Sequence, residues 1–221
     1  MTGQDCVLLV LGAGLSRRFG EDDKLEAVIG QRKLAHHLLG TVGNFNWQQK
    51  RVVHRANGNW HEAYEEAGFQ SLINAASERG LGASLALGIT GLPPETRVLV
   101  CLADMPFIST DLIGTLRAAS EAVPDQIFAS HSLDYRGPPA VFPVSDLRTL
   151  DPDSENGARP LLRRARLIAA TPDEIRDIDF REDAQEADRR MRQAESASLA
   201  HTTGLGKTTK EPSSQEKRHR Q

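Results

Sequence analysis

The sequence predicts a single α/β domain with a mainly parallel, Rossmann-like sheet arranged in three layers. Two continuous apolar runs, residues 6–11 and 97–102, are typical of strands that are buried on both faces. Segments with helical periodicity lie between the expected strands, and such alternation indicates a parallel sheet. In a sheet of this kind ligands bind beyond the carboxyl ends of the strands, so functional residues are expected there.

The expected elements alternate along the chain. The helix over residues 33–42 keeps its apolar side chains on one stripe, and the helix over residues 83–89 follows a glycine loop. Ser109 or Thr110 caps the next helix. The expected strands are residues 6–11, 51–54, 69–73, 97–102, 126–130 and 140–142. The expected helices are residues 33–42, 60–67, 83–89, 110–122, 159–166 and 183–194.

Composition excludes several classes of protein. The chain has 221 residues and a net charge of −3, which is too acidic for a strongly basic nucleic-acid binder. Aromatic residues make up only 5%, too few for base-stacking platforms. Cys6 and Cys101 are expected to be buried in strands, and their number excludes a disulfide scaffold. We therefore expect no nucleic-acid partner.

Residues 1–195 are expected to form the domain, and residues 196–221 a disordered basic tail. The latter segment is rich in Ser, Thr and Lys and shows no apolar periodicity. No stretch approaches the length of a membrane span, so no membrane partner is expected. The first residues lack a basic region typical of signal peptides, and the expected compartment is the cytoplasm.

The loop after the first strand has the composition of a phosphate-binding loop. It reads Leu11-Gly12-Ala13-Gly14, and Arg18 and Lys24 follow. Glycines allow backbone N–H groups to approach an anion closely, and fixed cations suit triphosphate oxygens. We expect Lys24 to be an exposed loop charge whose loss leaves the fold intact.

Two common nucleotide-binding signatures fit this loop poorly. A dinucleotide fingerprint requires a third glycine where Arg17 stands, and no acidic residue ends the strand at residues 51–54. The Gly-Lys-Ser/Thr end of a Walker A loop is absent. An NAD-dependent oxidoreductase therefore stays only as an alternative from a different class.

The loop resembles the signature of the MobA-like NTP transferases, in particular the molybdenum cofactor cytidylyltransferases. The matching pattern is Gly12-Ala13-Gly14-x-Ser16-x-Arg18-x-Gly20 followed by Lys24, and the resemblance covers roughly residues 6–190. Gly12 stands where the family usually has alanine, and three residues rather than two separate Gly20 from Lys24. The resemblance implies a sheet of the nucleotide-diphospho-sugar transferase type.

The resemblance also implies a Mg²⁺ site and a nucleotide pocket. Asp104 in Leu-Ala-Asp-Met-Pro matches the family's metal-binding aspartate, and Asp179 is a possible second contact. Arg18, Lys24 and Asp104 would be the catalytic residues. The implied nucleotide-binding residues are Leu11, Gly12, Ala13, Gly14, Arg18, Lys24, Asn74, Gly80 and Ser84.

The implied acceptor-binding residues are Gly137, Gly157 and Arg159. The surrounding motifs depart from the family pattern: Pro138 replaces a histidine, Ser154-Glu155 replaces Gly-Asp, and Phe180-Arg181 replaces Thr-Pro. These changes leave open whether the acceptor differs or activity is lost.

The resemblance implies transfer of a nucleoside monophosphate from an NTP to a phosphorylated acceptor, with release of pyrophosphate. CTP and molybdopterin are the favoured pair, and the product would pass to a molybdoenzyme or its chaperone. GTP is the first alternative, and other phosphorylated acceptors for a cytidylyl group come next. A catalytically silent nucleotide-binding protein is a further alternative.

Overall fold

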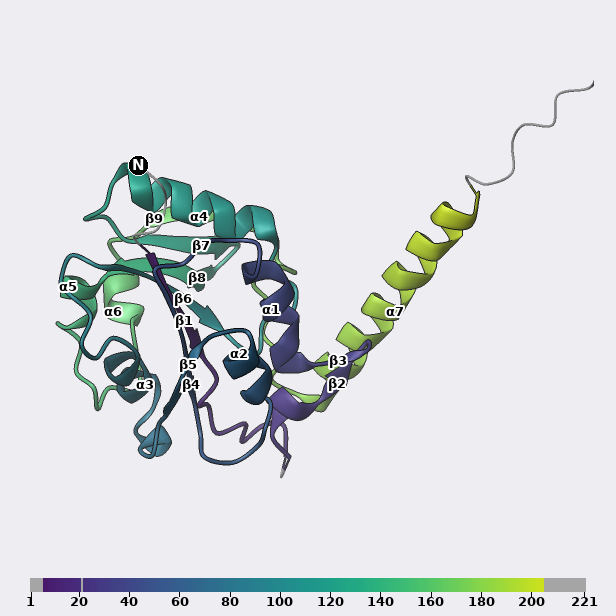
Figure 1. Cartoon of the computed structure of the whole chain (residues 1–221), viewed down its shortest axis with the longest axis horizontal. Helices are drawn as coiled ribbons and strands as arrows, with labels where there is room; N and C mark the ends of the chain where they lie inside the picture. The colour runs from purple at the N-terminus through teal and green to yellow at the C-terminus, as the bar shows by residue number, and fades with distance from the viewer. Residues whose placement is uncertain (1–5, 21, 205–221) are drawn as a thin grey trace, which may run out of the picture.

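The sheet dominates the computed structural model, which describes residues 6–20 and 22–204. The described residues form a seven-stranded sheet in the order β5-β4-β1-β6-β8-β7-β9, together with a small hairpin of β2 and β3 (Figure 1). The strands of the large sheet are β1 (Cys6–Leu11), β4 (Gln49–His54), β5 (Gln70–Ile73), β6 (Arg97–Leu102), β7 (Phe128–Ser132), β8 (Tyr135–Pro143) and β9 (Arg166–Ala169).

The predicted mainly parallel sheet is confirmed. β1 lies at its centre and pairs in parallel with β4 and β6, and β5 extends the sheet in parallel beyond β4. β8 is antiparallel to both β6 and β7, and β9 is parallel to β7. The carboxyl ends of β1, β4 and β6 therefore meet at one edge.

Helices cover both faces of the sheet and complete the predicted three layers. Along β1, Leu8 and Val10 face one core, whereas Val7 and Leu9 face the other, and all four are fully buried. The first core is covered by α1, α2, α4 and the start of α7, and the second by α3, α5 and α6. These helices are α1 (His37–Val42), α2 (Glu62–Glu66), α3 (Leu81–Gly88), α4 (Thr110–Ala122), α5 (Val144–Leu147), α6 (Arg159–Leu162) and α7 (Arg181–Gly204).

Two local predictions were wrong. The helix expected over residues 159–166 ends at Leu162, and Arg166 instead begins β9, because its N–H donates to the Ile127 carbonyl and joins the sheet. The helix expected from residue 33 begins later, because β2 (Val28–Ile29) and β3 (Arg32–Lys33) form a hairpin first. The expected cap of α4 is confirmed at Ser109, whose side chain accepts from the Leu112 N–H.

The predicted start of the disordered tail at residue 196 was also wrong. α7 continues to Gly204 and points away from the sheet (Figure 1). Pairs of opposite charge one helical turn apart, such as Glu186 with Arg190 and Asp188 with Arg192, support this helix, and several alanines of high helix propensity follow them. Residues 205–221 lie outside the described part, so disorder there stays a prediction.

Burial of the two cysteines agrees with the sequence. Cys6 and Cys101 are both free and buried. Among the described helices, we find none with the length and apolar character needed to cross a bilayer.

Candidate active site

The glycine loop leaves β1 at the sheet edge and is held there by both neighbouring strands. The Gly12 N–H donates to the Val53 carbonyl of β4, and the Ala103 N–H after β6 donates to the Leu11 carbonyl. A Cβ on Gly12 would lie 2.4 Å from the Trp60 ring, so only glycine fits this position without movement. The loop therefore has a fixed path across the ends of three strands.

A cavity of about 470 Å³ opens beside this loop. It brings together most of the residues that the sequence predicted for the nucleotide and the metal. Its lining includes the predicted residues Leu11, Gly12, Ala13, Gly14, Arg18, Lys24, Gly80, Ser84, Asp104 and Asp179.

Lys24 lies between two carboxylates from distant parts of the chain. Its Nζ is 2.7 Å from Asp104 Oδ2 and 2.9 Å from Asp179 Oδ1. The Lys24 side chain is only 9% exposed, so the expectation of an exposed loop charge was wrong. Burial alone would lower the pKa of Lys24, but the two carboxylates outweigh it and raise that pKa above its usual value. The ammonium is therefore charged and held in place.

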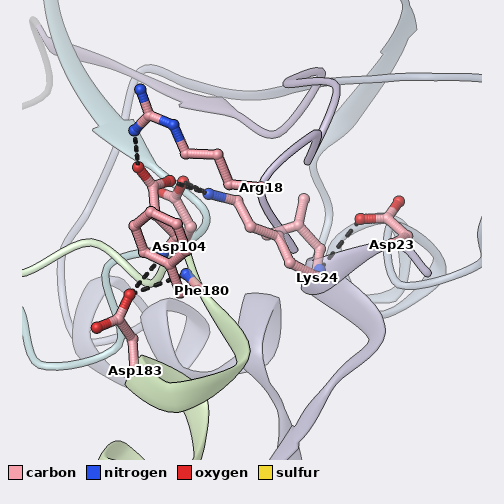
Figure 2. Close-up of polar contacts among 8 residues, drawn as sticks. Arg18, Asp23, Lys24, Asp104, Phe180 and Asp183 are labelled. Atoms are coloured by element: carbon pink, nitrogen blue, oxygen red, sulfur yellow. Dashed lines mark hydrogen bonds and ion pairs between the residues drawn. The ribbon is translucent and has the colours of Figure 1, made fainter. Parts of the chain in front are cut away.

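Local structure explains how Lys24 and Asp179 reach this position. Asp23 caps the short helical turn that carries Lys24 by accepting from the Leu25 N–H (Figure 2). At the start of α7, Asp183 accepts from the N–H groups of Asp179 and Phe180, which fixes the segment before the helix. Both site residues thus belong to capped helix starts.

Arg18 provides a second cation at the mouth of the cavity. Its guanidinium lies 2.9 Å from Asp179 Oδ2, and its side chain is 68% exposed. Burial tends to raise the pKa of Asp179, but Lys24 and Arg18 together lower it below its usual value. In Figure 2 the Arg18 guanidinium reaches the carboxylates from above and the Lys24 ammonium reaches them from the right. A polyanion entering here would meet two cations that can exchange one anionic partner for another.

Asp177 is a functional candidate that sequence reasoning did not assign. Burial raises the pKa of its carboxyl, and the nearby charges of Asp104 and Asp179 raise it further. Among the described residues, the carboxyl groups of Asp104, Asp177 and Asp179 form a cluster around Lys24. The single positive charge of Lys24 does not neutralise all three. The Asp-x-Asp spacing of residues 177 and 179 was the available signal in the sequence.

The carboxylate cluster fits a hard divalent cation. Asp104 Oδ1 is buried and has no hydrogen-bond partner among the described residues. An ionised buried oxygen without a donor is costly, and it is suited to act as a ligand. Mg²⁺ prefers one or two carboxylate oxygens together with phosphate oxygens, which is what this corner of the cavity offers.

Asn74 is not among the described residues that line the cavity, but it contacts Ser84, which is one of them. Its Nδ2 donates to Ser84 Oγ at 3.0 Å, and its Oδ1 accepts from the Ala76 N–H. Asn74 is buried, and Ser84 reaches the cavity in its place. The amide of Asn74 is thus directed at Ser84, and its contact with the base stays a prediction.

Two glutamates, Glu78 and Glu155, line the same part of the cavity as Gly80. A Cβ on Gly80 would lie 3.1 Å from Glu155 Cα, and the Gly82 N–H donates to the Ser154 carbonyl, so the loop before α6 closes over the start of α3. In the sequence, Glu155 stands out only as a departure from a family motif, and Glu78 has no predicted role.

The predicted acceptor residues Gly137, Gly157 and Arg159 do not line the cavity that the described residues form. Gly157 adopts a φ of +50° and packs against Leu81, so its role here is in the turn before α6. Because Leu81 lines the cavity, Gly157 lies behind its wall, and the acceptor role of all three residues stays a prediction.

Comparison with known proteins matches most of the chain to one family. The family model for the MobA-like NTP transferase domain matches residues 8–170. A molybdenum cofactor guanylyltransferase of Shewanella sp. (strain W3-18-1) is 30% identical over 143 residues, covering 63% of this chain and 69% of that protein. A protein of the same name from Mesorhizobium japonicum is 30% identical over 141 residues, covering 61% of this chain and 65% of that protein.

Solved structures show the same fold at low sequence identity. A nucleotidyl transferase from Methanothermobacter thermautotroptrophicus has a TM-score of 0.70 at 17% identity, covering 86% of this chain and 98% of that chain. The molybdopterin-guanine dinucleotide biosynthesis protein A of Archaeoglobus fulgidus has a TM-score of 0.60 at 17% identity, covering 85% of this chain and 99% of that chain. The fold is therefore of the nucleotide-diphospho-sugar transferase type.

Proposed function

The chain belongs to the MobA-like NTP transferase family, and we propose that it transfers GMP from GTP to the phosphate of a molybdopterin-type acceptor. The observation that carries the proposal is the cavity beside the glycine loop, in which Lys24 lies against Asp104 and Asp179. Cations and carboxylates at the end of a parallel sheet suit a triphosphate and its metal ion.

The choice of GTP departs from the CTP that the sequence favoured. The two relatives described above are both named molybdenum cofactor guanylyltransferase. We infer that the base binds beside Glu78 and Glu155, which line the cavity and would supply acceptor oxygens. The Watson–Crick edge of guanine presents two adjacent N–H donors, which one carboxylate accepts together. The edge of cytosine presents acceptors next to its single amino group and would face a carboxylate unfavourably.

Arg18 and Lys24 would bind the β- and γ-phosphates. In the structure both cations contact Asp179, so triphosphate oxygens would compete with this carboxylate for the same donors. The backbone of residues 12–14 would face the phosphates from the other side. This arrangement neutralises the charge that builds on the leaving pyrophosphate.

Asp104 is the residue proposed to hold Mg²⁺, because its buried Oδ1 has no donor among the described residues. Asp179 and Asp177 would complete or stabilise the site from the segment before α7. The bound ion would supply charge neutralisation on the phosphate oxygens.

The reaction needs orientation more than proton transfer. An oxygen of the acceptor phosphate attacks the α-phosphorus, a new P–O bond forms there, and the bond to the β-phosphate oxygen breaks. The attacking oxygen is already anionic, so no general base is required. The chain contributes by aligning the two phosphates and excluding water. We further propose that the dinucleotide product passes to a molybdoenzyme or its chaperone.

The test is pyrophosphate release by the full chain with GTP, CTP and ATP, each with and without molybdopterin. Release with GTP and molybdopterin together supports the proposal. Faster release with CTP would replace the guanylyl assignment with the cytidylyl one. Tight NTP binding without release would identify a silent nucleotide-binding protein, and thermal stabilisation by NAD alone would refute the transferase assignment.

Base choice has its own test within this assay. Glu155→Gln and Glu78→Gln each replace one acceptor oxygen by an amide donor at nearly the same shape. The variant that loses GTP but not CTP turnover identifies the glutamate that faces the base. If neither changes the GTP-to-CTP ratio, the carboxylates do not select the base.

A further inference from the structure

Two residues before and at the start of α7 that depart from the family pattern, Phe180 and Arg181, contact the end of the glycine loop. The Arg18 guanidinium carbon lies 5.9 Å from the centre of the Phe180 ring. Conversely, the Arg181 guanidinium carbon lies 5.3 Å from the centre of the Phe19 ring. Both distances are within reach of cation–π attraction. Consecutive residues of the loop are thus paired crosswise with consecutive residues at the helix start.

Ion pairs join the same two segments. Arg18 lies 2.9 Å from Asp179, and Arg181 lies 2.7 Å from Asp22. Arg181 also lies along the loop backbone, because a Cβ on Gly20 would be 3.3 Å from its Nη2. Gly20 has a φ of +109°, which glycine adopts without strain, so the loop turns where the arginine passes. Side chains on both sides of this turn therefore hold the end of the loop to α7.

Phe180 is not needed for the hydrophobic cores. It is 46% exposed, and it packs in neither of the two cores that the described residues form. Its backbone is fixed, since the Phe180 N–H donates to the Asp183 carboxylate at 2.8 Å (Figure 2). An exposed ring contributes little to folding, so the contact with Arg18 is what distinguishes this position.

Arg181 is not needed for the helix that it begins. It is the first residue of α7, a position that readily accommodates proline, the residue that the family usually has. A cation there is unfavourable, because the helix dipole places partial positive charge at this end. The arginine thus acts against the helix, and its contacts with Phe19, Gly20 and Asp22 account for its presence.

We propose that Phe180 and Arg181 are positioning residues that fix the end of the glycine loop and hold Arg18 ready for a triphosphate. This inference rests on the proposed function only in requiring that a triphosphate binds at Arg18. Asp179 competes with phosphate oxygens for the N–H groups of Arg18, whereas an aromatic ring attracts the cation as a whole. Phe180 can therefore keep its contact when a triphosphate replaces Asp179, and less side-chain entropy is lost on binding.

Four variants of the full chain test the proposal. Phe180→Leu removes the ring but stays apolar, and Phe180→Tyr is its matched control, because it keeps the ring. Arg181→Gln removes the charge that contacts the loop. Arg189→Gln is its matched control, since Arg189 is an exposed residue of the same helix and pairs with Glu186, one turn away.

Amide hydrogen exchange of residues 18–20 in the absence of nucleotide measures whether the loop is held. Exchange should be faster in Phe180→Leu and in Arg181→Gln than in the parent, and it should be unchanged in both controls. Melting temperatures should stay close to that of the parent, because the lost contacts are largely exposed.

Calorimetric titration with GTP and with GMP measures the effect on Arg18. Phe180→Leu and Arg181→Gln should each weaken GTP binding by roughly two- to fivefold, as expected for the loss of one exposed cation–π contact. GMP lacks the β- and γ-phosphates assigned to Arg18, so its binding should not change. In an Arg18→Met background, Phe180→Leu should not weaken GTP binding further, because the positioned group is already gone.

Faster loop exchange together with weaker binding of GTP, but not of GMP, supports the proposal. Unchanged exchange in both test variants, an equal loss of GTP and GMP affinity, or an equal loss in either control would overturn it. Faster exchange with unchanged GTP binding would also overturn it, because the loop would then not position Arg18. A parent that binds no nucleoside triphosphate would refute the proposed function and the role of Arg18 together. The exchange rates would still decide whether Phe180 and Arg181 fix the loop.

Discussion

The six-membered ring of Trp60 lies directly against the backbone of Gly12, so that a Cβ there would be 2.4 Å from the ring. This contact explains why the chain has glycine at a position where the family it resembles usually has alanine. Trp60 is almost fully buried and packs edge-on against Tyr64, so it has little freedom to move away.

Gly12→Ala should therefore destabilise the protein by about 1–3 kcal/mol, the usual result of overpacking a buried contact. In a Trp60→Phe background the same change should cost less, because the clashing ring atoms are gone. Urea unfolding of the four proteins measures this coupling. Gly14→Ala is the matched control, since nothing lies within 4 Å of a Cβ at that position. Equal destabilisation by both alanine variants would contradict the explanation.

Lys24→Ala should lower both NTP binding and stability. The variant leaves Asp104 and Asp179 without their shared cation, and losing a hydrogen bond to a charged group costs about 1–3 kcal/mol. Lys24→Ala/Asp179→Asn should recover part of the stability but not the binding. A stable Lys24→Ala protein with normal turnover would show that another cation performs this role.

Asp104→Asn should reduce turnover by roughly 10²–10³, the usual effect of losing one electrostatic contact at the reacting phosphates. The neutral amide keeps the shape but is a poor Mg²⁺ ligand. Steady-state rates against Mg²⁺ concentration test this, with circular dichroism as the control for folding. Full activity and an unchanged Mg²⁺ dependence in the folded variant would refute the metal assignment.

Asp177 should make the protein less stable as pH rises. Its folded-state pKa is raised above the ordinary value of 3.8, so the folded state holds this proton more tightly than the unfolded state does. Stability contributed by the protonated form is present below 3.8 and is lost as pH rises through the folded-state value. Asp177→Asn should abolish this contribution and be more stable than the parent at neutral pH.

The test compares the unfolding free energies of the parent and of Asp177→Asn, measured from below pH 3.8 to neutral pH. Lowered carboxyl pKa values outside this cluster, such as that of Glu26, act in the opposite direction in both proteins and cancel in the difference. Two parallel curves would contradict the assignment of a raised pKa to Asp177. Added Mg²⁺ should flatten the parent's curve, because a cation favours the ionised carboxylates.

The central strands were predictable because a strand that is buried on both faces needs a continuous run of apolar residues. β1 and β6 match the two apolar runs residue for residue, and the Ser109 cap of α4 follows from its residue type. β9 was missed because its four residues have no clear pattern, and pairing with β7 alone makes them a strand.

The candidate site was predictable in its residues but not in its contacts. The glycine loop, Lys24 and Asp104 follow from motif order, and they do line one cavity. The burial of Lys24 depends on Asp179, which lies 155 residues further along the chain, and no local pattern reports such a contact. Asn74 was placed at the base because its type suits that role, whereas packing turns its amide towards Ser84.

The distribution of the site along the chain also constrains when the protein becomes active during its synthesis. The matched family region ends at residue 170, before Asp177 and Asp179. Once β1 through β9 have emerged from the ribosome, the nascent chain can already build its sheet. Lys24 then still lacks the carboxylate of Asp179. Activity should therefore appear only after the start of α7 has emerged. To test this, nascent chains arrested at increasing lengths would be assayed for bound nucleotide. Retention of nucleotide should begin only in chains long enough to expose the start of α7.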